Sequence, residues 1–210
     1  MADTVKCDAF ADLYSNLAYC AGSVSMPGIR ARAYFIPKKH ITTWPTLPLG
    51  AATSMDKVAV YAGNFKLAAE KYFKYFDLVD GENEPKCEQV GSFGSMHFQN
   101  TVTLVIPGTE EAATGLITML NNEDVVVVII QRNGKARVLG NDMFRTNVKP
   151  SQTLGKGTSD ANTTTIEVSV EDVAAAPFYP GEIVIEAGVK ISGADGKPIP
   201  VDPNPGDSGS

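Results

Sequence analysis

The sequence predicts a mainly β protein, in which two packed antiparallel sheets form a barrel-like sandwich flanked by one α-helix. Three observations lead to this fold class. Residues 96–106 alternate apolar and polar side chains, residues 125–130 are six consecutive β-branched residues, and Asn133-Gly134 is a strong hairpin signal. A segment with helical periodicity lies between the first two, at residues 109–122.

The region from Met96 to Gly140 carries the clearest pattern. The first strand places one set of side chains towards a core (Met96, Phe98, Val102, Leu104, Ile106) and the other towards water or a partner (His97, Gln99, Thr101, Thr103). Pro107-Gly108 ends this strand, and Thr109 is the expected N-cap of the helix. Residues 125–130 should be a strand covered on both faces, and residues 136–139 should return from the hairpin.

Other segments add strands at the two ends of the domain. We expect strands at residues 30–36, 58–62, 164–170 and 183–185, the last followed by a small hairpin at most. Residues 65–76 fit a helix or strands, and we favour strands. Trp44 is either a core residue or a contact residue. Residues 81–95 and 141–163 are polar and should be long loops.

This pattern divides the chain into three parts. Residues 1–28 form an N-terminal arm, residues 29–187 the β domain, and residues 188–210 a Pro/Gly-rich C-terminal extension. The arm, the 81–95 loop and the extension are too polar or too rich in Gly and Pro to bury themselves. We therefore expect these three segments to contact neighbouring subunits.

Composition excludes several classes of protein. The net charge is −6, which argues against binding to a phosphate backbone, because such binding needs a basic patch. The three cysteines, Cys7, Cys20 and Cys87, form no CxxC pair, which favours a reduced site of synthesis such as a bacterial cytoplasm. The N-terminus has no long apolar run of the signal-peptide type, and residues 125–130 are too few to span a membrane. We expect a soluble protein.

No motif indicates catalysis. Gly206-Asp207-Ser208-Gly209 copies a serine-protease nucleophile segment but lies in the tail, and Gly155-Lys156-Gly157-Thr158-Ser159 lacks the first glycine of a phosphate loop. The two histidines, His40 and His97, have no metal-ligand partner nearby in sequence. Three acidic pairs lie at the ends of predicted helices or strands, where capping and solvation explain their presence: 110–111, 123–124 and 171–172. We expect no catalytic residue, cofactor or metal.

Several short segments resemble segments of phage tail tube proteins of the Bacteroidetes phage and prophage type. They are residues 29–37, residues 91–95 leading into the Met96 strand, the helix at 109–122, residues 132–140, and Ala176-Pro177-Phe178-Tyr179. The resemblance covers roughly residues 29–186 and implies a virion protein whose subunits form rings, typically hexameric, that stack into a tube. It further implies contacts with other tail or neck proteins, and passage of DNA through the lumen without specific binding.

The polar faces of two predicted strands are candidates for the inner wall of such a tube. Thr165, Glu167, Ser169 and Glu171, with Gln99, Thr101 and Thr103, lie opposite the predicted core residues and either line an acidic or neutral channel or form ordinary outer surface. Alternatives to the tail tube are a neck, ring or capsid-decoration protein of the virion, a monomeric β-barrel binding or adhesin module, and an enzyme with a hidden carboxylate or serine site.

Overall fold

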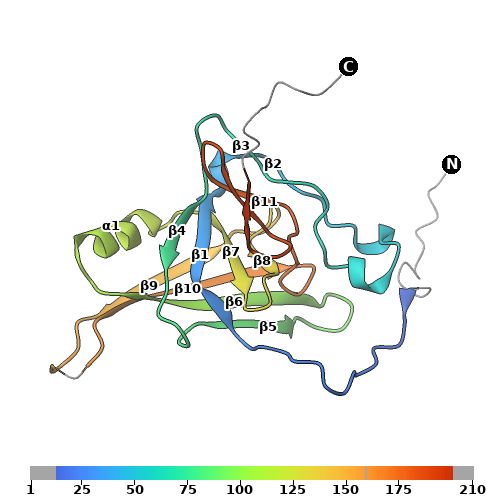
Figure 1. Cartoon of the computed structure of the whole chain (residues 1–210), viewed down its shortest axis with the longest axis horizontal. Helices are drawn as coiled ribbons and strands as arrows, with labels where there is room; N and C mark the ends of the chain where they lie inside the picture. The colour runs from blue at the N-terminus through green and yellow to red at the C-terminus, as the bar shows by residue number, and fades with distance from the viewer. Residues whose placement is uncertain (1–12, 159, 201–210) are drawn as a thin grey trace.

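Two four-stranded antiparallel sheets form the centre of the protein, with two smaller sheets and one α-helix around them (Figure 1). The computed structural model describes residues 13–158 and 160–200. The strand order is β4-β1-β7-β8 in one large sheet and β5-β6-β10-β9 in the other; the small sheets are β11-β12-β13 and β2-β3. The bounds are β1 Ile29–Pro37, β2 Ile41–Thr43, β3 Lys66–Leu67, β4 Lys74–Asp77, β5 Glu84–Val90, β6 His97–Pro107, α1 Glu111–Leu120, β7 Val125–Gln131, β8 Ala136–Leu139, β9 Asn147–Thr153, β10 Thr163–Asp172, β11 Glu182–Glu186, β12 Val189–Ser192 and β13 Pro198–Ile199.

The sheet β4-β1-β7-β8, which we call the covered sheet, has apolar cores on both faces. In β7 all six residues from Val125 to Ile130 are buried, as the β-branched run predicts. Val125, Val127 and Ile129 face one core, and Val126, Val128 and Ile130 face the second, which contains Phe73 and Tyr179. Trp44 packs against this second core, with its ring 5.5 Å from that of Phe65.

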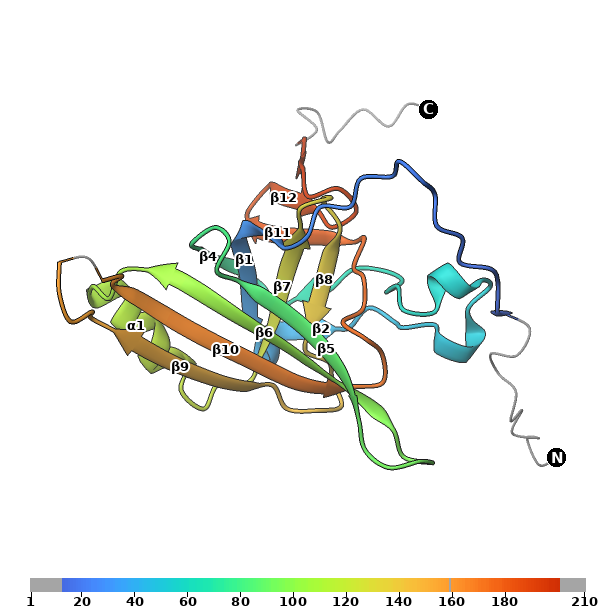
Figure 2. The ribbon, with the colours of Figure 1, turned by 90° about the horizontal axis from the view of Figure 1, so that it is seen from below.

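The sheet β5-β6-β10-β9, which we call the open sheet, buries one face only. Its core residues join those of the covered sheet in a single cluster: Val102, Leu104 and Ile106 of β6, and Ile166, Val168 and Val170 of β10. The long strands of the open sheet cross those of the covered sheet, and α1 lies beside β9 and β10 (Figures 1 and 2). Leu120 of α1 belongs to the shared core.

The mainly β class, the antiparallel sheets and the flanking helix agree with the sequence prediction. The strands of the described residues close into no barrel, so the barrel-like form of the predicted sandwich is not confirmed. Residues 65–76 contain short strands, as we favoured, but β4 pairs with β1 rather than with the segment that follows it. The N-cap is Glu110, not Thr109, and its side chain makes no capping hydrogen bond.

Three segments were predicted wrongly. Residues 81–95 contain β5 and residues 141–163 contain β9, where we expected loops. Both are edge strands with most residues exposed on both faces, so they lack the apolar alternation that marks a strand in sequence. Residues 58–62 form no strand: Val60 and Ala62 make isolated bridges, and Tyr61 is buried in the second core.

The chain continues to fold beyond residue 187. The predicted strand at 183–185 is β11, but β12 pairs with it and β13 pairs with β12. Ile191 of β12 packs against the second core. The part of the predicted C-terminal extension up to Pro200 is therefore tied to the domain, and residues 201–210 lie outside the described residues, as do residues 1–12 of the predicted arm.

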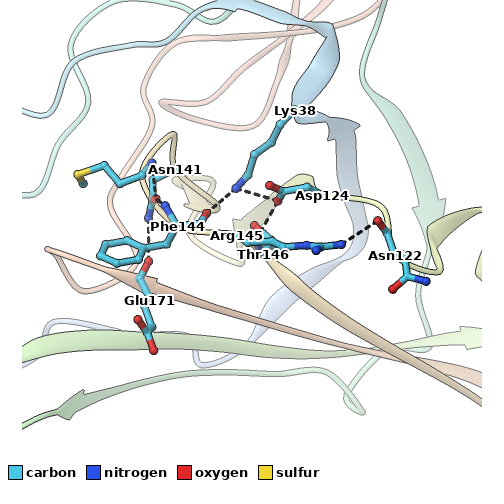
Figure 3. Close-up of polar contacts among 9 residues, drawn as sticks. Lys38, Asn122, Asp124, Asn141, Phe144, Arg145, Thr146 and Glu171 are labelled. Atoms are coloured by element: carbon cyan, nitrogen blue, oxygen red, sulfur yellow. Dashed lines mark hydrogen bonds and ion pairs between the residues drawn. The ribbon is translucent and has the colours of Figure 1, made fainter.

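A polar network fixes the connection that carries the chain from the covered sheet to the open sheet (Figure 3). The Lys38 ammonium contacts Asp124 Oδ1 at 2.8 Å and donates to the Phe144 carbonyl at 2.6 Å. The same Asp124 oxygen accepts the Thr146 N–H at 2.9 Å. Asn141 accepts the Phe144 N–H and donates to the Glu171 carbonyl. The network sets where β9 begins.

Candidate functional site

The strongest candidate surface is the face of the open sheet that points away from the core. Strand register places the odd-numbered residues of β6, β9 and β10 and the even-numbered residues of β5 on this face. None of its side chains belongs to either apolar core, although Val105 of β6, whose backbone contacts Asn83, is buried. The face carries Glu84, Lys86 and Glu88 (β5), His97, Gln99, Thr101 and Thr103 (β6), Asn147, Lys149 and Ser151 (β9), and Thr165, Glu167, Ser169 and Glu171 (β10).

The structure brings together all seven residues that we predicted for one strand face. Glu167 lies opposite Thr103, Ser169 opposite Thr101, and Glu171 opposite Gln99. Their neighbours Ile166, Val168 and Val170 are buried, so the alternation is confirmed. This places the seven side chains on an uncovered surface of the chain.

The charge of this face is net acidic. It holds four glutamates against two lysines, which gives −2 with His97 neutral. Each lysine has a carboxylate neighbour: Lys86 Nζ contacts Glu88 Oε1 at 2.6 Å, and Lys149 lies directly opposite Glu167. The hydrogen bond that Lys86 donates to Glu88 raises the pKa of Lys86. His97 Nε2 lies 3.7 Å from Glu171 Oε2.

Both edges of the open sheet lack a partner strand within the described part of the chain. β5 pairs only with β6, and β9 pairs only with β10. Val105 of β6 directs its backbone to the β5 side, since its N–H donates to Asn83 Oδ1 and its carbonyl accepts from Val79. By the alternation of an antiparallel ladder, the backbone groups of Pro85, Cys87 and Gln89 then face away from β6.

A buried polar cluster lies behind the open sheet, at the corner 173–178. Asn100 of β6 donates to the Ala174 carbonyl at 3.0 Å and accepts the Ala176 N–H at 2.9 Å. Asp172 is 1% exposed; its Oδ1 accepts the Val173 N–H at 2.7 Å, and its Oδ2 has no partner. Burial raises the pKa of Asp172. These groups hold a backbone corner and have the geometry of a structural cluster.

A small cavity of about 230 Å³ lies between β5 and β8, with Cys87 and Arg137 in its wall. The Arg137 guanidinium stacks on Phe178 at 3.9 Å and donates to the Ala176 carbonyl at 2.9 Å. Burial lowers the pKa of Arg137 and raises that of the Cys87 thiol. A raised thiol pKa is the opposite of what a nucleophilic cysteine needs. The Cys87 thiol therefore lacks the lowered pKa of a nucleophilic cysteine.

The other sequence candidates are scattered. His40 lies in a 3₁₀ turn and His97 on the open face, and the described residues contain no group of three metal-ligating side chains. Residues 155–158 connect β9 to β10 rather than a strand to a helix, so they form no phosphate loop. Residues 206–209 lie outside the described residues. Glu123 and Asp124 pair with Lys39 and Lys38.

Sequence reasoning missed the contribution of the two edge strands to the open face. Glu84, Lys86 and Glu88 of β5 fell within a predicted loop, as did Lys149 of β9. The charged residues of β5 alternate with Pro85 and Cys87, a period of two that was the only available signal.

Comparison with known proteins adds nothing to this geometry: no family model, curated protein or solved structure matches the chain. None of the helices in residues 13–158 and 160–200 combines the length and the apolar character needed to cross a membrane. The site must be interpreted from its own contacts.

Proposed function

We propose that the chain is a structural virion subunit that assembles into stacked rings, forming a phage tail tube through which the genome passes. The observation that carries the proposal is the open sheet, whose two edges are both unpaired within the described residues and whose polar face is uncovered. A long unpaired edge is a template for another strand, and closing sheets into a ring removes it.

The directions of the strands support ring closure. Each neighbouring pair in the order β5-β6-β10-β9 is antiparallel, so β5 and β9 run in opposite directions. Copies related by rotation about an axis along the strands then bring β9 of one copy beside β5 of the next in antiparallel orientation. The open sheets of a ring would join into one large barrel, although a single chain has none.

The charge of the open face supports a role as channel wall. A wall that conducts DNA needs short, uncharged or acidic side chains, because each free lysine or arginine adds an attractive phosphate contact. The face has Ser, Thr, Asn and Gln between its glutamates, and its two lysines have carboxylate neighbours. Other tail and neck proteins would be partners at the ends of the tube, and no catalytic role is part of this proposal.

Electron microscopy of the purified full chain tests the proposal. Rings or tubes are expected, with the open face towards the channel. Cys87→Pro should abolish them, because it removes an N–H that faces away from β6, whereas Cys87→Ser keeps that N–H and should assemble. A chain that shows only monomers or dimers at high concentration contradicts the proposal, as does a ring whose open face points outward.

A second readout concerns DNA. Replacing Glu167 and Glu171 together by lysine changes the charge of the open face from −2 to +2. We expect assembled wild-type protein to leave duplex DNA unbound, and the double variant to bind it in a salt-dependent way. Equal binding by both would argue against a lumen on this face.

A further inference from the structure

The β5 edge has a property that the β9 edge lacks: its charges complement a second copy of itself. The outward backbone groups are those of Pro85, Cys87 and Gln89, inferred above from the Val105 contacts. The side chains on the open face are Glu84, Lys86 and Glu88. Lys86 and Glu88 have opposite charges and lie one residue to either side of Cys87.

We propose that two free subunits pair through antiparallel β5 strands about a two-fold axis at Cys87, in a dimer that covers the β5 edge before assembly. In this register Cys87 lies opposite Cys87, and Lys86 of each copy lies opposite Glu88 of the other. Each Gln89 N–H can donate to the Pro85 carbonyl of the second copy. Opposite charges directly across an antiparallel pair stabilise it.

Neighbouring registers are disfavoured by the same charges. A shift of the axis to Lys86 places the two Lys86 side chains opposite each other and Glu84 opposite Glu88 of the second copy. A shift to Glu88 places the two Glu88 carboxylates opposite each other. Like charges directly opposite are destabilising, so the charges of β5 favour the register centred on Cys87 over both of these.

The β5–β6 hairpin supplies an apolar contact in this register. It projects beyond the rest of the open sheet (Figure 2), and Phe93 at its tip is 99% exposed. The turn is closed by the Ser95 N–H on the Ser92 carbonyl at 2.9 Å, with Gly94 at a φ of 91°. Antiparallel pairing about Cys87 directs the Phe93 tip of one copy towards the Gly81 end of β5 in the other.

Gly81 lines a largely apolar pocket of about 500 Å³, together with Met26, Pro27, Gly28, Ile29, Asn83 and Arg132. The pocket and the Phe93 tip lie beyond opposite ends of β5, so a two-fold dimer forms this contact twice. An aromatic side chain entering a pocket is a typical anchor of protein interfaces.

The dimer bears on the regulation of assembly in the proposed function but does not depend on it. A ring needs β5 of each copy for β9 of the next, and the two-fold dimer covers β5. A dimer is a closed unit, because an isologous interface uses the same surface on both copies. Dimerisation would therefore hold subunits out of the tube.

Charge reversal on the full chain tests the pairing. In a dimer of the Lys86→Glu variant, two carboxylates lie opposite each other on either side of the Cys87 pair. In a dimer of the Glu88→Lys variant, two ammonium groups lie opposite each other at the same two places. Each variant alone should therefore dimerise at least about tenfold more weakly in sedimentation equilibrium. Mixing the two variants sets a carboxylate opposite an ammonium at both positions and should restore the dimer, although within each variant the two β5 charges repel. Failure of the mixture to recover wild-type affinity overturns the proposal.

Cross-linking gives a second, independent test. Opposed Cys87 residues should have Cα atoms about 5.5 Å apart, within the range of a disulfide. In a Cys7→Ser/Cys20→Ser background, diamide should take two protons and two electrons from the two thiols and form a Cys87–Cys87 bond. Phe93→Ala should slow this cross-link. No cross-link, or one unaffected by Lys86→Glu, overturns the proposal; rings without such dimers would leave the tube proposal standing.

Discussion

The covered sheet and the open sheet share a core but differ at their edges. The β8 edge of the covered sheet is capped by the chain itself: Ala136 donates to Gly193 at 2.8 Å and accepts from Tyr179 at 2.9 Å, and Val138 donates to Pro177 at 3.0 Å. The β5 edge of the open sheet has no such cap among the described residues. One edge is completed within the subunit, and the other is available to a second chain.

The faces differ in the same way. Both faces of the covered sheet are buried, whereas one face of the open sheet is polar and uncovered. The covered sheet therefore contributes to stability through both of its faces, and the open sheet through its buried face only. The uncovered face of the open sheet can vary with little cost to folding. Substitutions that separate these two roles are the direct way to test the comparison.

The largest effect is expected from removing the cap of the covered sheet. Truncation after Ala187 deletes β12 and β13, and so loses the β11–β12 ladder and the backbone hydrogen bonds of Gly193 with Ala136 and Gly181. It also removes Ile191, which packs on the second core. We expect a loss of about 4 kcal/mol or more in the free energy of unfolding. Truncation after Pro200 is the reference, because it keeps every one of these contacts.

The next largest effect is expected from a substitution in the core of the covered sheet, compared with one on the uncovered face of the open sheet. Ile129 is fully buried in β7, and Ile129→Ala should cost about 2–5 kcal/mol in the free energy of unfolding. Ser169→Ala, on the uncovered face of the open sheet, should change it by less than about 0.5 kcal/mol. Similar losses in the two variants, measured by urea unfolding, would mean that the open face is covered.

A smaller effect is expected at the point where the open sheet holds the corner 173–178. Asn100→Ala leaves the Ala174 carbonyl and the Ala176 N–H without their partner, at a cost of about 1–3 kcal/mol. Gln99→Ala, the adjacent residue on the open face, should be close to neutral. Thermal unfolding of both variants measures the difference.

The smallest effect is a change in pH dependence at Asp172. Burial raises the pKa of this carboxyl in the folded state, so the folded protein binds its proton more tightly than the unfolded chain does. The stabilisation from the protonated form is complete below the unfolded pKa and is lost as pH rises through the raised folded pKa.

Asp172→Asn keeps an oxygen for the Val173 N–H and removes the titration. The variant should therefore gain stability relative to wild type as pH rises from about 4, near the ordinary aspartate pKa, towards neutrality, as measured by thermal unfolding. Glu167→Gln, on the exposed face, is the matched control. A constant difference between wild type and Asp172→Asn across this range would contradict the assignment.

The sequence predicted the strands whose burial imposes a period. β6, β7 and β10 have at least one buried face, and their side chains show it, as do the hairpin at Gly134 and the helix before β7. β5 and β9 are edge strands set by pairing with β6 and β10, and they show no apolar alternation; β5 has only the alternation of its charged residues. The seven face residues were predicted from period alone, but their charged neighbours on the edge strands were not.

The contacts of Arg30 have a consequence for how the chain folds. Its guanidinium, in the first strand, donates to the carbonyls of Gly196 and Asp195, and Gly134 is so close to Asp195 that a Cβ there would collide with its carbonyl. The two Arg30 contacts join residues 165 and 166 positions apart in sequence. At roughly 5–20 residues per second, a ribosome needs on the order of 10–30 s to make that interval. During synthesis β1 must wait for the segment that completes its surroundings, so this high contact order favours slow, late folding.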